Sequence, residues 1–133
     1  MEPTKERRRA GGCAWVALWV FAAFVLATSG ILYGNARVMD AWHWCLTQDH
    51  EPDPRLAAAT RSAWAVGFVT LLLPGAVLSP LPRSRRYLLP VMVVTAAALT
   101  WLYVTGMGAP APLPPGVPPE VACWRLPSFP FTG

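Results

Sequence analysis

Three long stretches of this chain carry no charged residue, and this feature restricts the possible folds more than any other. The stretches cover residues 10–34, 62–80 and 87–107. Each supplies about 20 helical residues, which at about 1.5 Å per residue is enough to cross a hydrocarbon core of about 30 Å. The sequence therefore predicts three transmembrane helices over these ranges.

The overall composition supports a membrane protein. Only 14% of the 133 residues are charged, whereas a soluble domain carries about 25%. The predicted spans contain no Asp, Glu, Lys, Arg or His, the groups that mark proton relays and ion paths inside a bilayer. We therefore expect an all-α integral membrane protein that is not an enzyme, has no cofactor and is not a proton-coupled transporter or pump.

The distribution of Lys and Arg predicts the orientation. Seven of the eleven basic residues lie in the segments 1–9 and 81–86, and four lie in 35–61 and 108–133. Short basic segments stay on the cytoplasmic side, so we expect a cytoplasmic N-terminus and loop, and an exoplasmic loop and C-terminal tail. The basic segments should also contact anionic lipid headgroups. The predicted topology anchors are Arg7, Arg8, Arg9, Arg83, Arg85 and Arg86.

Two further points concern the compartment. An amino-acid composition rich in Ala, Pro, Arg and Trp is typical of a high-GC bacterial genome, which suggests a bacterial plasma membrane. An alternative reads the first stretch as a signal peptide that is cleaved near Gly34-Asn35-Ala36. Signal cores span about 7–15 apolar residues, so the longer stretch here favours a retained span.

The exoplasmic loop contains a helical pattern. Val38, Trp42, Cys45 and Leu46 have the spacing of one helical face, and Asn35 is a residue type that caps helix N-termini. We therefore expect a short helix at the membrane interface, which either closes the bundle or presents its Trp residues to lipid.

The tail begins with six prolines between Pro110 and Pro119, which predict an extended, polyproline-like segment. Apolar residues follow, and they should fold back onto the loop or dock on a partner. The predicted partner surface consists of Trp42, Trp44, Trp124, Phe129 and Phe131.

The cysteines divide between the two sides of the membrane. Cys45 and Cys123 fall on the exoplasmic side, where disulfides persist, and Cys13 falls at the cytoplasmic edge. The sequence predicts a bridge between Cys45 and Cys123 that ties the tail to the loop. Two free thiols, or bridges to a partner, are the alternatives.

Small residues and a Pro-Gly pair indicate how the spans pack. Small residues allow close backbone approach in membranes, and a proline inside a helix removes a hydrogen bond and kinks it. We expect the kink at Pro74 and Gly75. The predicted packing residues, at the exoplasmic ends of the first two spans, are Gly30, Gly34, Ala59, Ala63 and Gly67.

The sequence is compatible with three functions. The sequence favours a non-enzymatic accessory or scaffold subunit with a membrane-protein partner. A small oligomeric channel or transporter-like protein is the alternative. A third is an exoplasmic metal or redox sensor that uses His43, Cys45, His50 and Cys123, with Asp49 as a further ligand. The basic segments are too short to support nucleic-acid binding.

Overall fold

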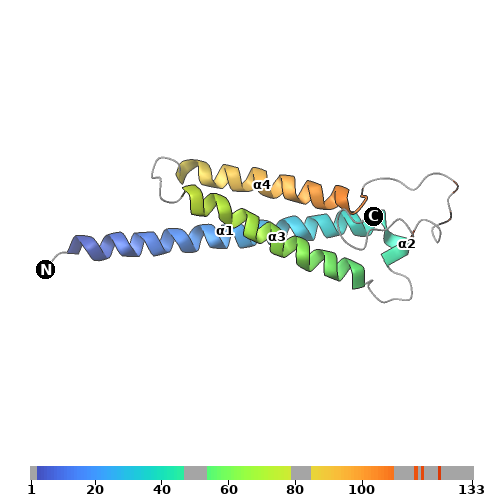
Figure 1. Cartoon of the computed structure of the whole chain (residues 1–133), viewed down its shortest axis with the longest axis horizontal. Helices are drawn as coiled ribbons and strands as arrows, with labels where there is room; N and C mark the ends of the chain where they lie inside the picture. The colour runs from blue at the N-terminus through green and yellow to red at the C-terminus, as the bar shows by residue number, and fades with distance from the viewer. Residues whose placement is uncertain are drawn as a thin grey trace.

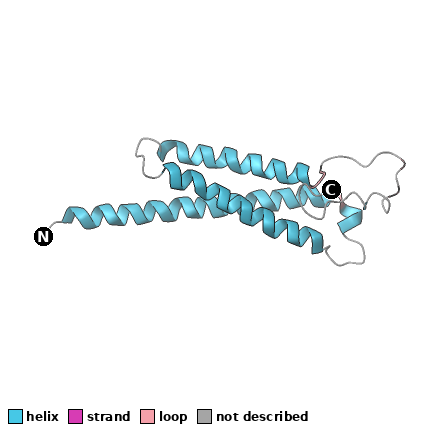
Figure 2. Ribbon diagram, viewed as in Figure 1, coloured by secondary structure: helices cyan, strands magenta, loops and turns pink. Residues whose placement is uncertain are grey.

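The computed structural model describes residues 3–46, 54–78 and 85–109, together with Gly116, Pro118 and Cys123. Of residues 3–11, 44, 45 and 55 it describes the backbone alone. The described chain forms four helices: α1 (Pro3–Ala41), α2 (His43–Leu46), α3 (Pro54–Leu78) and α4 (Arg85–Gly106). No strand occurs among the described residues (Figure 2). The predicted all-α class is confirmed for this part of the chain.

Three of the helices could each cross a membrane. Gly12–Ala41, Leu56–Leu78 and Arg85–Gly106 contain 30, 23 and 22 residues, and each is apolar enough to span. Even the shortest is about 33 Å long at about 1.5 Å per residue, which matches the hydrocarbon core of a bilayer. The chain is therefore a small three-helix membrane protein.

The helices pack as a bundle in which every pair of long helices is in contact. α3 and α4 run antiparallel, α1 lies against both, and the N-terminal part of α1 projects beyond them (Figure 1). α4 therefore runs parallel to α1, and both end near α2. This arrangement gives the bundle two distinct ends, which we call the α2 end and the Arg85 end.

The first helix is longer than predicted. It continues past residue 34 to Ala41, a turn follows at Trp42, and α2 begins at His43. Asn35 therefore lies inside α1 and does not cap a separate helix, because no helix-breaking residue follows it and its amide bonds to other helices. Three of the four residues of the predicted helical face, Val38, Trp42 and Leu46, are buried, and the side chain of Cys45 lies outside the described residues.

Two clusters of buried side chains hold the bundle together. One lies at the α2 end and includes Val38, Leu46, Ala59, Tyr103 and Met107. The other lies toward the Arg85 end and consists of Ala23, Ala27, Leu71, Leu88, Met92 and Ala96.

The spans expose many large apolar side chains on their outer faces. In the most apolar part of each span, only 11% of residues in α1 and α3 and 22% in α4 are buried. Without a hydrophobic effect between helices and lipid tails, such faces are ordinary for a membrane bundle. These surfaces suit lipid chains or the helices of another membrane protein.

Candidate functional site

A polar link joins the three long helices at the α2 end. The Asn35 side chain of α1 donates to Thr60 Oγ1 of α3 at 3.0 Å, and the Thr60 hydroxyl lies 3.1 Å from Asn35 Oδ1, to which it can donate in return. The Tyr103 hydroxyl of α4 donates to the same Asn35 Oδ1 at 2.7 Å. One amide thus bonds to both neighbouring helices.

This link is important because the surroundings are apolar. A buried amide or hydroxyl without a partner is unfavourable, and hydrogen bonds between membrane helices each contribute about 0.6–2 kcal/mol. The three side chains satisfy one another and fix the helices in one register. The link was not predicted from the sequence: Asn35 was expected to cap a helix, and its partners Thr60 and Tyr103 lie 25 and 68 positions away in the chain. No local sequence pattern marks such a contact.

Trp42 is part of the core, which corrects its prediction as a partner-surface residue. Its side chain is 8% exposed, and its Nε1 donates to the Met107 carbonyl at 2.8 Å. The indole also packs over Gly108, whose φ of 71° favours glycine. The continuation of α1 turns Trp42 inward, so that it holds the chain that leaves α4.

The other predicted surface residues lie outside what the structure describes. These are the Trp44 side chain, Trp124, Phe129 and Phe131. They remain predictions.

The predicted disulfide is not supported by the described residues, because the side chain of Cys45 is not among them. Cys13 is an exposed free thiol, whereas Cys123 is half-buried and not free of interactions. Two of the predicted metal ligands, Asp49 and His50, also lie outside the described residues. No group of three His, Cys, Asp or Glu side chains comes together in the described part of the chain.

Gly30 and Gly34, two of the predicted packing residues, lie against α4. A Cβ at Gly34 would lie 2.7 Å from Tyr103 Cδ1, and one at Gly30 would collide with Thr100. The small residues thus bring α1 close enough to α4 for Tyr103 to reach Asn35.

The small residues of α3 divide between two environments. Ala59 is fully buried, and Ala63 packs against the same cluster at the α2 end. A Cβ at Gly67 would meet nothing within 4 Å.

The predicted Pro74-Gly75 pair lies inside α3, which continues to Leu78. Gly75 is buried against Trp19 of α1, where a Cβ would lie 2.6 Å from Cδ2. This glycine therefore serves close helix packing, and the kink stays a prediction.

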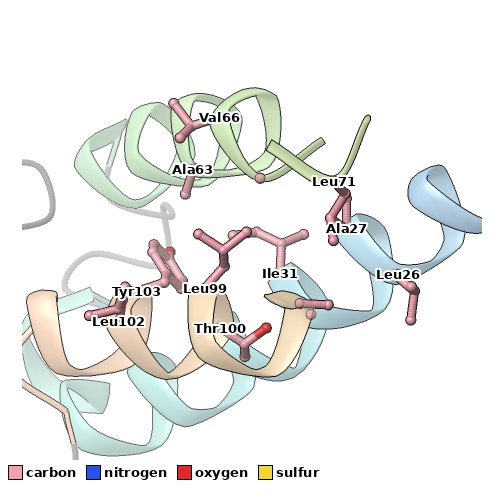
Figure 3. Close-up of a pocket in the computed structure, with 13 residues that line it drawn as sticks. Leu26, Ala27, Ile31, Ala63, Val66, Leu71, Leu99, Thr100, Leu102 and Tyr103 are labelled. Carbon is pink, nitrogen blue, oxygen red and sulfur yellow. The ribbon is translucent and has the colours of Figure 1, made fainter. Parts of the chain in front are cut away.

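A cavity of about 230 Å³ lies between α1, α3 and α4, beside Gly67. Ala63 of α3 points toward the other two helices, whereas Val66 points away (Figure 3). The walls are apolar apart from Thr100 and Tyr103. A site of this kind can hold an apolar group.

The opposite end of the bundle carries cations over aromatic rings. The Arg85 guanidinium lies 5.4 Å from the centre of the Trp15 ring, and that of Arg86 lies 4.7 Å from Tyr87. Both arginines are exposed. Cations and amphipathic rings together favour the headgroup region. The side chains of Arg7, Arg8, Arg9 and Arg83, the other predicted anchors, lie outside the described residues.

Comparison of the chain with protein-family models, with curated proteins and with solved structures gave no match. The fold and the residues above are therefore the basis for any function.

Proposed function

We propose that this chain is a non-enzymatic accessory or scaffold subunit that presents an ordered exoplasmic surface to a membrane-protein partner. The observation that carries the proposal is the bond from Tyr103 to Asn35, which with Thr60 joins three helices beneath that surface. A second support is Trp42, which attaches the chain after α4 to the end of α1. Both contacts stiffen the end from which the loop and tail extend.

The proposed orientation puts the N-terminus in the cytoplasm and the α2 end outside, in a bacterial plasma membrane. The excess of Lys and Arg in segments 1–9 and 81–86 supports it. Arg85 and Arg86, exposed at the other end of the bundle, suit the cytoplasmic headgroups.

A disulfide between Cys45 and Cys123 would hold the tail against this surface. Its support is that Cys13 is a free thiol whereas Cys123 is half-buried and not free, and that Leu46, beside Cys45, is buried in the core. Peptide mapping without reductant, on protein isolated under oxidising conditions, should recover Cys45 and Cys123 in one linked pair. Recovery of both as free thiols contradicts the bridge.

The partner is tested by crosslinking in the native membrane. A photo-crosslinking amino acid at Trp124 or Phe131 should yield one discrete heteromeric product, because the tail forms part of the surface. The matched control places it at Val77, which is exposed near the opposite end of α3, and should yield no such product. Equal products at all three positions contradict the proposal.

A small oligomeric channel is the second candidate, and the broad exposed apolar faces of the spans favour it. Native mass spectrometry from mild detergent separates the two. A defined homo-oligomer without any second protein supports the channel and contradicts the scaffold.

A further inference from the structure

A groove runs along the bundle between α1 and α4, with a volume of about 510 Å³. Gly30, Tyr33 and Arg37 line it from α1, and Ala97, Trp101 and Thr105 line it from α4. Residues of both helices line the groove along its length. It extends from the middle of the bundle to the α2 end.

The lower part of the groove, toward the middle of the bundle, is mostly apolar, although Ser29 and Thr100 also line it. Gly30 and Ala97 contribute little or no side chain there, which leaves room for a hydrocarbon chain. Leu26, at the lower end, lies eleven residues before Arg37, which is about 16 Å along a helix. That is about half of a hydrocarbon core of about 30 Å, so the groove has the length of one lipid leaflet.

The upper part of the groove has the chemistry of a headgroup site. Arg37 lies one turn beyond Tyr33, and both are exposed. Trp101, which is 66% exposed, lies on the opposite wall. A guanidinium binds phosphate with charge-assisted hydrogen bonds, and Tyr and Trp rings favour the headgroup level. Asp40, the nearby carboxylate on α1, does not line the groove.

We propose that this groove binds one anionic glycerophospholipid, with its phosphate at Arg37 between Tyr33 and Trp101, and with one acyl chain along Gly30 and Ala97. The proposal is independent of a protein partner. It rests on the length of the groove and on the charge of Arg37, the one cation among the described residues that line it. Since it places the lipid by the α2 end, it does not depend on which way the protein faces.

The test is native mass spectrometry of the full chain in mild detergent, titrated with phosphatidylglycerol, with phosphatidylcholine and, separately, with inorganic phosphate. Arg37→Gln removes the cation, and Ala97→Leu fills the lower groove at an exposed position. The controls are Arg61→Gln, an exposed arginine of α3, and Ala98→Leu, an exposed alanine of α4. Neither control residue lines the groove. Circular dichroism checks that all four variants keep the helical content of the unchanged protein.

We expect one phosphatidylglycerol per chain, bound more tightly than phosphatidylcholine, and no retained inorganic phosphate. Arg37→Gln should weaken phosphatidylglycerol binding at least about fivefold, and Ala97→Leu should weaken both lipids, whereas the controls should change neither. Equal binding of the two lipids, equal loss in Arg61→Gln and Arg37→Gln, retention of inorganic phosphate alone, or a homodimer in place of bound lipid would each overturn the proposal.

Discussion

The phenolic hydroxyl of Tyr103 donates a hydrogen bond of 2.7 Å to the amide oxygen of Asn35, a residue 68 positions earlier in the chain. The same amide donates to Thr60 of α3. The polar side chain near the C-terminal end of α1 thereby bonds to both neighbouring helices, and these bonds hold the three spans in one register.

Replacement of Asn35 should loosen the bundle. Asn35→Leu removes the shared partner of Thr60 and Tyr103, and with membrane hydrogen bonds at about 0.6–2 kcal/mol each we expect a loss of about 1–3 kcal/mol in the free energy of unfolding. Titration with a denaturing detergent, followed by circular dichroism, measures this free energy of unfolding. Ser29→Ala is the control, since Ser29 is exposed and bonds only within its own helix. Equal stability of the two variants would show that the link contributes nothing.

Two tryptophans should respond differently to the same change. Trp42→Phe removes the donor to the Met107 carbonyl and should lower the free energy of unfolding by about 1–2 kcal/mol more than Trp19→Phe does. The Trp19 Nε1 is buried without a hydrogen-bond partner in the structure, so its removal leaves no group unpaired.

Both substitutions replace an indole by a phenyl ring, and of the two residues only Trp42 thereby loses a hydrogen bond to a main-chain carbonyl. Unfolding in detergent, followed by the remaining tryptophan fluorescence, gives both values. A larger loss for Trp19→Phe would contradict the assignment of Trp42 as the residue that holds the end of α4.

Close helix approach predicts a difference between two glycines. Gly34→Ala places a methyl group against the Tyr103 ring, so we expect a loss of about 1–3 kcal/mol from overpacking and from displacement of the Tyr103 hydroxyl. Gly67→Ala meets open space and should be neutral or slightly stabilising, because alanine favours a helix over glycine. Thermal unfolding of both variants in one detergent tests this. Similar losses at both positions would mean that the contact of α1 with α4 is not close.

The free thiol of Cys13 reports on orientation. It is exposed at the start of the first span, and with a cytoplasmic N-terminus it should react in intact cells with a membrane-permeant maleimide but not with an impermeant one. After the cells are opened, both reagents should label it. Labelling of Cys13 itself by the impermeant reagent in intact cells, located by peptide mapping, would reverse the proposed topology.

Much of the architecture was predictable from the sequence because each span is decided locally. A helix of about 20 apolar residues satisfies its own backbone and needs no neighbour to be stable in lipid, so the three spans follow from charge and length alone. The spacing of Val38, Trp42 and Leu46 on one helical face was also predictable, since it is a property of the local sequence, whereas the burial of Trp42 in the core was not.

Tertiary packing decided what those residues do. Trp42 lies in the core because the chain after α4 returns to the end of α1. Gly30 and Gly34 pack against α4. Which helix they contact depends on how α1 is rotated relative to its neighbours.

Asn35 shows most clearly the difference between what the local sequence predicts and what tertiary packing decides. Its own sequence neighbourhood predicted a helix cap, whereas its partners Thr60 and Tyr103 come from two other helices. The sequence alone determined the number of spans, because backbone hydrogen bonding and hydrophobicity act within each helix. Only the tertiary structure decided the polar link, the role of Trp42 and the α1–α4 groove, because each forms from side chains that meet only after the helices pack.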